Sequence, residues 1–319
     1  MQTSQKILPA FLQNKSTRFK ALLALSMVCF FWGTTWIASK EGVRHMPALQ
    51  MAGIRQLMGG FLYAVFFIGN GRSLPRGKEW IPILVLSFLN FMLSNSLSTW
   101  GVQFISAGLG SIIGATFPLW LVVIGLIRKK PSIPQAAVIG SLLGFGGICV
   151  IFSEHLHEFT RSDFLFGITI SFMASWSWAF GTLYTKDQAK AFNPYFSLGL
   201  QMLISGIVLT SLTGITGDYI PLSKIPWQSW MAIAYLLIFG SVISFIAYLY
   251  ALQHLSTQQT SIYAYINPVV AVILGVLIFN EKITLFIAIG GVISLYGVFI
   301  INQSFRKMNR FARLDHASS

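Results

Sequence analysis

Ten apolar runs, each close to 20 residues long, constrain the fold of this chain more than any other feature of its sequence. A run of about 20 residues spans roughly 30 Å of hydrocarbon as an α-helix. Of the 319 residues, 55% are hydrophobic and 10% are charged, whereas about 25% are charged in soluble domains. We therefore predict an all-α polytopic membrane protein. The ten predicted transmembrane helices are residues 20–39, 48–69, 80–99, 104–127, 134–152, 163–184, 195–213, 228–250, 257–279 and 283–302.

The distribution of basic residues predicts the topology. The net charge is +13, which alone would suggest a nucleic-acid ligand. If the N-terminus is inside, however, 16 of the 22 Lys and Arg residues lie in cytoplasmic segments and five in outer loops, as the positive-inside rule requires. We therefore expect a multi-pass membrane protein with both termini in the cytoplasm. We expect the lipid bilayer to surround the chain, and we expect no nucleic acid partner.

The segments before and after the spans are short. Residues 1–19 are predicted to be a cytoplasmic N-terminal segment, and residues 303–319 a basic cytoplasmic tail. The first apolar run is too long for a cleaved signal, so we expect it to remain in the membrane. Cys29 and Cys149 both fall within spans, which argues against a disulfide framework and a metal site. No cofactor is predicted.

The chain repeats itself. With a shift of 150 residues, segment 80–152 lies over segment 230–302 without a gap, and Pro118 matches Pro268. With a shift of 146, Trp32 matches Trp178 and Arg55 matches Gln201. We therefore predict two five-helix repeats, residues 20–152 and 163–302. Because five is odd, the second repeat enters the membrane from the opposite side, and the repeats are inverted. Inverted repeats are typical of secondary transporters, whose substrate sites lie near the midplane.

Pro118 and Pro268 lie inside predicted helices at matched positions. A proline inside a helix removes a backbone hydrogen bond and favours a kink. In lipid, the freed carbonyl group must find a partner or face a water-filled cavity. Two interpretations stay open: the kinks bend the helices for packing, or they place irregular backbone at a central, moving site.

The repeats resemble the EamA family of the drug/metabolite transporter superfamily. The resemblance rests on Phe31-Trp32-Gly33, on Arg55, on the proline of the fourth helix, and on NPVVAVILGVLIFNEKIT followed by GGVISLYGV. It covers residues 22–152 and 165–302. The family implies an inner-membrane carrier or exporter of small metabolites, often amino acids. Pro131 stands where the first repeat of the family commonly has an acid, the counterpart of Glu281, which argues against a mechanism that needs both carboxylates.

Arg55 is the only charged residue well inside a predicted span. A charge near the centre of a transmembrane helix costs about 2.5–3.5 kcal/mol on insertion scales, so it needs a partner. In one interpretation Arg55 is structural and bonds loop carbonyl groups or Glu41. In the other it faces the mouth of a cavity and holds a substrate carboxylate.

Tryptophans and polar side chains inside the spans supply the other candidates. Trp32 and Trp36 are one turn apart, and Trp176 and Trp178 lie in the matching sixth helix; these rings either form the walls of a pocket or fill space. The polar groups either line a cavity or bond helices together, a contribution of about 0.6 kcal/mol each. The predicted substrate-binding residues are Trp32, Trp36, Arg55, Asn90, Ser94, Asn95, Trp178, Gln201, Tyr263 and Asn267.

Glu281, at the outer end of the ninth span, is the one acid placed to carry protons. Its alternative role is to pair with Lys282 or Arg55 at the helix end. We group it with Pro118 and Pro268 as a gating or structural residue. The pairs Gly110/Gly114 and Gly140/Gly144 predict faces for close helix packing.

These observations favour a secondary transporter that moves a small organic metabolite by alternating access. The resemblance implies an amino acid or a related solute, and export over uptake. A membrane scaffold or receptor is the alternative, and an intramembrane enzyme is a weaker one. We predict no catalytic residues, because the sequence has no HExxH and no GxSxG motif. The expected partner is the solute, and monomer and homodimer both stay open.

Overall fold

The computed structural model describes residues 10–127, 133–154, 157–188, 193–255, 260 and 263–315. Throughout these residues the secondary structure is helical, as predicted. The elements of the first repeat are α1 (Ala10–Gly42), α2 (Ala48–Gly69), η1 (Gly77–Glu79), α3 (Trp80–Leu86), η2 (Ser87–Asn95), α4 (Ser96–Phe104), α5 (Ala107–Gly114), α6 (Phe117–Ile127) and α7 (Gln135–Glu154). The elements of the second are η3 (Glu158–Thr160), α8 (Ser162–Gln188), α9 (Pro194–Thr216), η4 (Leu222–Lys224), α10 (Trp227–Tyr235), η5 (Leu236–Ile243), α11 (Ser244–His254), α13 (Tyr263–Phe279) and α14 (Leu285–Asp315).

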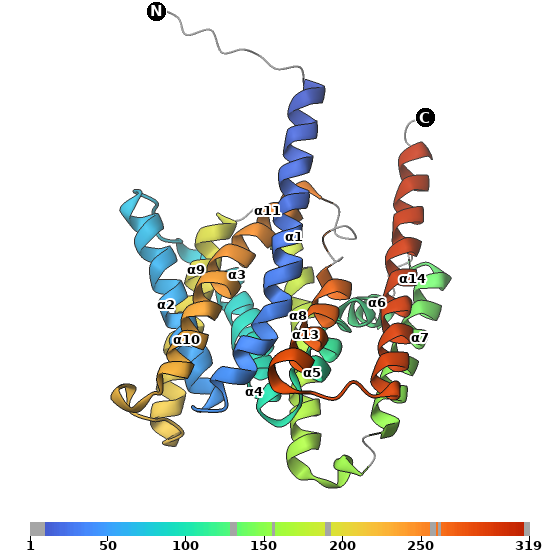
Figure 1. Cartoon of the computed structure of the whole chain (residues 1–319). Coiled ribbons are helices and arrows are strands. Elements are labelled where there is room, and N and C mark those ends of the chain that lie inside the picture. Colours follow the sequence, from blue (N-terminus) through green and yellow to red (C-terminus); the bar gives the residue numbers. More distant parts are fainter. Residues whose placement is uncertain are drawn as a thin grey trace, which may run out of the picture.

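The number of membrane crossings agrees with the prediction. Within the described residues, nine helices are long and apolar enough to cross a membrane, and α13 is a shorter apolar tenth. The N- and C-terminal ends emerge on the same side, where the free ends of α1 and α14 project (Figure 1). Two boundaries differ from the prediction. α1 starts at Ala10, inside the predicted N-terminal segment, and α14 continues to Asp315 through the predicted tail.

The helices of the two repeats pair about a pseudo-two-fold axis. α7 packs against α14, and there a Cβ added to Gly140 would lie 2.6 Å from the carbonyl oxygen of Gly297. A Cβ added to Gly147 would lie 2.5 Å from the carbonyl oxygen of Gly290. Gly140 and Gly290 are equivalent under the repeat, as are Gly147 and Gly297, so the two contacts mirror each other. Close approach of two backbones explains why small residues occupy this face.

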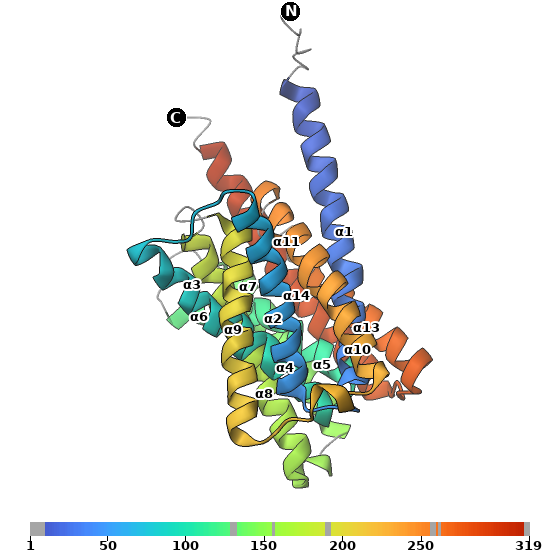
Figure 2. The ribbon, with the colours of Figure 1, turned by 90° about the vertical axis from the view of Figure 1, so that its left-hand side faces the viewer.

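α2 and α9 form the second such pair, on the opposite side of the molecule from α7 and α14 (Figures 1 and 2). A Cβ on Gly60 would meet the backbone of Leu203, and a Cβ on Gly206 would meet the backbone of Leu57. These four positions also exchange under the repeat. Between the two pairs lie the remaining helices: α1, α8 and the third, fourth, eighth and ninth crossings.

Two π-helical segments interrupt the third and eighth crossings. η2 (Ser87–Asn95) joins α3 to α4, and η5 (Leu236–Ile243) joins α10 to α11. The two segments overlap under the 150-residue shift. π-Helical turns are rare and frequently mark functional sites. The sequence predicted ordinary helices here, because the apolar periodicity of these segments does not distinguish the two helix types.

The two prolines differ in their surroundings, which the prediction of matched kinks did not anticipate. In the fourth crossing the helix breaks: α5 ends at Gly114, and α6 begins at Phe117. Pro118 therefore occupies the first turn of a new helix, where a missing N–H group costs little. Pro268, in contrast, lies inside the continuous helix α13.

Candidate functional site

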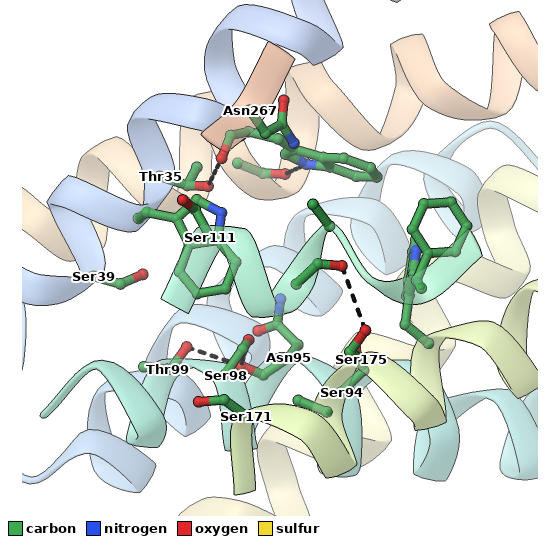
Figure 3. A pocket seen from close by; sticks show the side chains of 18 of the residues that line it. Thr35, Ser39, Ser94, Asn95, Ser98, Thr99, Ser111, Ser171, Ser175 and Asn267 are labelled. Carbon is green, nitrogen blue, oxygen red and sulfur yellow. Dashed lines mark hydrogen bonds between the residues drawn. The ribbon is translucent and has the colours of Figure 1, made fainter. Parts of the chain in front are cut away.

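The central cavity lies between the two repeats and contains about 990 Å³ of empty space. Its walls come from α1, α2, η2, α4, α5 and α6 of the first repeat and from α8, η5, α11 and α13 of the second. It extends from the middle of α1, at Trp32, toward the Gly42 end, at Ser39. Figure 3 shows the hydroxyl and amide groups that point toward this space from several helices.

An aromatic cluster closes the inner end of the central cavity. The Trp32 and Trp178 rings meet edge to face with centroids 5.8 Å apart, and Trp32 packs in the same way on Tyr263 at 5.0 Å. Trp178 Nε1 donates a hydrogen bond to the Tyr263 hydroxyl at 2.9 Å. The repeat-related tryptophans are therefore direct neighbours, and both line the cavity, together with Tyr263.

Trp36 lines the same cavity one turn along α1. A Cβ added to Gly110 would lie 3.0 Å from the Trp36 ring, and one added to Gly114 would lie 2.8 Å from it. The small residues of α5 thus make room for an indole, and the predicted helix-packing role of this pair is wrong. Trp176, in contrast, is 46% exposed on the outer surface and packs against Phe180.

Arg55 reaches the central cavity from α2 and is 6% exposed. Its Nη2 donates a hydrogen bond to Asn95 Oδ1, while its Nε has no hydrogen-bond partner. The expected pairing with Glu41 is wrong, because Glu41 instead contacts Arg44 and His45, each at 3.2 Å. The described residues form these two ion pairs, both at Glu41. No carboxylate among the described residues therefore neutralises Arg55.

Polar residues of the third crossing form a stripe that faces the cavity. Asn90, Ser94, Asn95 and Ser98 all line it, from η2 and α4. The Asn90 Oδ1 atom is buried and has no hydrogen-bond partner. Asn95 Oδ1 accepts from Arg55 and also from Gln56 Nε2, at 3.2 Å. This stripe therefore holds the guanidinium group in place, and its Asn90 Oδ1 atom packs against Gly181 of α8.

The broken fourth crossing is stabilised by the hydroxyl groups of its neighbour α8. The Gly114 carbonyl, four residues before Pro118, is 3.4 Å from Ser175 Oγ, which donates to it. Thr116 Oγ1 lies 3.1 Å from the same Ser175 hydroxyl. The carbonyl that the proline frees thus has a protein partner. The break and its partner both border the cavity, which Gly114 and Ser175 line.

Asn267 directly precedes the proline of α13 and bonds neighbouring carbonyl groups. With its amide nitrogen turned toward two carbonyl groups, Nδ2 lies 2.8 Å from the Cys29 oxygen and 3.1 Å from the Tyr263 oxygen. The side chain is 8% exposed and lines the cavity. Asn267 therefore ties the proline-containing segment of α13 to α1. Phe117, its repeat counterpart, instead stacks on Tyr263 with centroids 5.6 Å apart.

A second cavity, with about 710 Å³ of empty space, lies on the other side of the aromatic cluster. Asn90, Trp178 and Phe245 line both cavities and separate them. Gln201 lines the second cavity, where its Nε2 donates to Ser197 Oγ at 2.9 Å. Gln201 therefore does not share a cavity with Arg55, contrary to the grouping in the sequence prediction.

Glu281 forms no ion pair with Lys282 or Arg55 in the described structure. Its carboxylate accepts hydrogen bonds from the backbone N–H groups of Ala107, at 2.8 Å, and Gly108, at 3.2 Å. It thus caps the N-terminus of α5, where negative charge is favoured. Lys40 Nζ donates to the carbonyl oxygens of Val102 and Ile105, each at 2.7 Å. Together they hold the two-residue turn between α4 and α5. The counterpart Pro131 lies outside the described residues.

Sequence reasoning missed the hydroxyl residues of α8 and α1. Ser171, Ser175 and Trp178 are spaced by four and three residues, so they share one face of α8, and all three line the central cavity. A search of this helix for polar and aromatic residues three or four positions apart would have found them. Thr35 and Ser39 of α1 lie near this space as well (Figure 3). In the described chain, no group of three His, Cys, Asp or Glu residues could hold a metal ion.

Comparisons with known proteins agree with this architecture. Residues 19–153 and 165–303 each match the profile of the EamA-like transporter family. The uncharacterized inner membrane transporter YedA of Escherichia coli K12 is 30% identical over 268 residues, which cover 81% of this chain and 84% of the relative. The uncharacterized transporter YoaV of Bacillus subtilis is 23% identical, with 90% of this chain and 98% of the relative covered.

One plant relative and one solved structure extend the comparison. The chloroplastic WAT1-related protein At3g02690 of Arabidopsis thaliana is 28% identical over 86% of this chain. A crystal structure that covers 88% of this chain superposes with a TM-score of 0.65 at 16% sequence identity. At that identity, the superposition supports the shared fold alone.

Proposed function

Because the chain belongs to the EamA-like transporter family, we propose that it is a secondary carrier that moves a small organic solute across the membrane by alternating access. The observation that carries this proposal is the pair of cavities on opposite sides of the aromatic cluster. Asn90, Trp178 and Phe245 line both of them. A solute would pass from one cavity to the other if these three side chains moved apart.

The inverted repeat supplies the second conformation. The two repeats exchange under the pseudo-two-fold axis, so the contacts that close one side have counterparts that can close the other. Ser94 of η2 lines the open cavity, for example, and Ser244, its counterpart, follows η5 in the eighth crossing. Both π-helical segments and the break in the fourth crossing border the separating residues. Such irregular segments can change backbone hydrogen bonds at low cost, as a moving gate requires.

The proposal includes an orientation. The basic residues favour both termini in the cytoplasm of a cell whose inner membrane holds the protein. The central cavity then opens outward, because it extends toward the ends of α1 and α4 that lie opposite the termini. We propose an amino acid or a related metabolite as the solute, and export as the direction. A scaffold or receptor would not need two inverted repeats with a cavity on each side of the aromatic cluster.

The test is solute counterflow in proteoliposomes that contain the purified full chain. Vesicles preloaded with one unlabelled metabolite should accumulate the same labelled metabolite, for at least one member of a panel of amino acids and organic acids. Vesicles without protein are the control. An exchange rate equal to this control for every member of the panel would refute the carrier. Reporter fusions after residues 158 and 319 should report outside and inside, and the same location for both would refute the orientation.

A further inference from the structure

Arg55 is the one charged side chain among the described residues that line the central cavity. It is buried, its Nε has no hydrogen-bond partner, and the described carboxylates do not pair with it. An unpaired charge inside a membrane is costly unless an opposite charge joins it. The empty cavity therefore holds one uncompensated positive charge beside the space that a solute would fill.

We propose that the cavity selects organic solutes that carry one carboxylate, with Arg55 as the residue that holds this carboxylate. The inference rests on the proposed carrier function and names the class of its solute. A guanidinium group offers several N–H donors in a plane, and it binds carboxylates through charge-assisted hydrogen bonds. One cation balances one negative charge, so a dianion would leave a net charge in the membrane.

Asn95 is placed to complete this anion site. Its Oδ1 accepts from both Arg55 and Gln56, which fixes the orientation of the amide. The Nδ2 group consequently faces away from these donors, and Figure 3 shows it directed toward the middle of the cavity. An amide N–H group is a donor, so it favours an anion and disfavours an ammonium group.

The remainder of the cavity is suited to an apolar or aromatic skeleton. Trp32, Trp36 and Trp178 contribute ring surface to it. No acidic side chain occurs among its described lining residues, so an ammonium group of the solute would find no carboxylate. We therefore expect the carboxylate of the solute to be required and an amino group to be dispensable.

The test compares matched probes on the purified full chain by tryptophan fluorescence. The probes are phenylacetate, phenylacetamide and phenethylamine, with hexanoate and hexanamide as a second skeleton. We expect each carboxylate to bind about tenfold more tightly than its amide, because the amide loses the charge-assisted bonds, and we expect phenethylamine not to bind. Equal affinity for the carboxylate and the amide, tighter binding of the amine, or no binding of either carboxylate would overturn the inference.

Variants of Arg55 test whether this residue causes the preference for the carboxylate over the amide. Arg55→Gln, which copies the second repeat, should reduce the carboxylate preference to about twofold or less, and Arg55→Lys should keep part of it. Lys224→Gln is the matched control, since it removes one exposed positive charge from η4 and should leave the preference unchanged. A folded Arg55→Gln protein that keeps the full preference would overturn the inference, and the wild-type comparison decides the question if that variant does not fold.

The counterflow panel separates this inference from the carrier function. Exchange that is confined to solutes without a carboxylate would refute carboxylate selectivity and leave the carrier intact. Exchange of monocarboxylates that their amides fail to inhibit would support both. Absence of exchange for every solute would refute the carrier, whatever the binding results.

Discussion

The two repeats share a backbone plan but carry different chemistry at matched positions. Arg55 of α2 faces the central cavity, whereas its counterpart Gln201 of α9 faces the second cavity. The glycine contacts between α7 and α14 are, in contrast, nearly the same in both directions. Symmetry is therefore kept where the backbones pack and in the Trp32–Trp178 pair, and it is lost at Arg55 and Gln201. This difference indicates which residues serve the architecture and which serve the transport.

The largest effect should come from breaking the symmetric contact itself. Gly147→Leu places a side chain against the backbone of Gly290 and Ser294. Overpacking of this kind costs about 1–3 kcal/mol or more, and we expect the amount of folded protein in the membrane to fall about fivefold or more. Quantitative blotting of detergent-solubilised, monodisperse protein measures this.

The adjacent Gly146 provides the matched control for that variant. Gly146 is exposed, and a Cβ there would meet nothing within 4 Å. Gly146→Leu should therefore keep wild-type abundance, while Gly297→Leu, at the position equivalent to Gly147, should behave like Gly147→Leu. Normal abundance of both Gly147→Leu and Gly297→Leu would show that α7 and α14 do not pack as the structure has them.

The next effect concerns the asymmetric pair Arg55 and Gln201. Arg55→Gln should lower transport about tenfold at matched abundance, because a charge-assisted bond to the solute is worth about 1.5–3 kcal/mol. The double variant Arg55→Gln/Gln201→Arg moves the cation from one cavity to the other. We expect the side with the higher apparent affinity to switch, measured as the half-saturating solute concentration on each face of oriented vesicles.

The direction of net flux should not follow this switch. A higher affinity on one face is offset by the equilibrium between the two conformations, so affinity alone cannot drive accumulation. A double variant that transports normally but keeps the wild-type sidedness would show that Arg55 and Gln201 are not equivalent in the transport cycle.

The broad architecture was predictable from the sequence because it depends on strong, repeated signals. The apolar runs predicted the number of crossings, and the 146-residue shift related Trp32 to Trp178, the tryptophans that meet in the aromatic cluster. The separation of Arg55 from Gln201 was missed because the prediction grouped the two residues by their repeat match, although an inverted repeat places matched residues on opposite sides of its axis. The cap that Glu281 forms on α5 was also missed, since it joins residues about 170 positions apart.

The π-helical segments and the break at Ala115 and Thr116 show a second limit. Their geometry depends on tertiary partners, such as the Ser175 hydroxyl beside Thr116. The residues of the segment itself do not reveal a hydrogen-bond partner on another helix. The sequence correctly identified Pro118 and Pro268 as special positions, but it could not show that one begins a helix and the other lies within one.

A smaller effect should distinguish these two prolines. Pro268→Ala restores an N–H group inside a continuous helix and should lower transport several-fold if α13 must bend during the cycle. Pro118→Ala changes the first turn of α6, where proline is well tolerated, so we expect a weaker effect. Transport rates at matched abundance measure both. The reverse order would show that the break in the fourth crossing is the moving element.

Asn267 and Phe117 extend that comparison. Asn267→Ala removes the donor to the Cys29 and Tyr263 carbonyls, so we expect the half-saturating solute concentration to rise a few-fold. Phe117→Ala removes a ring that stacks on Tyr263 and should lower abundance more than affinity. An unchanged affinity in the Asn267 variant would mean that its amide serves only the contact between α1 and α13.

The smallest effect should come from Glu281. Glutamine keeps one oxygen that can accept from Ala107 or Gly108 but loses the charge at the N-terminus of α5, a change of about 0.3–1 kcal/mol. Glu281→Gln should therefore transport within a few-fold of wild type. Lys282→Gln, which changes the exposed neighbouring residue, is the control.

If the carboxylate of Glu281 only caps the helix, accumulation driven by a proton gradient should survive in the variant to the extent that the wild type shows it. If the carboxylate carries protons, exchange at equilibrium should persist while proton-driven accumulation is lost. Measurement of both modes in the same vesicles therefore decides whether the acid found in the second repeat clamps the turn between α4 and α5 or couples the carrier to protons.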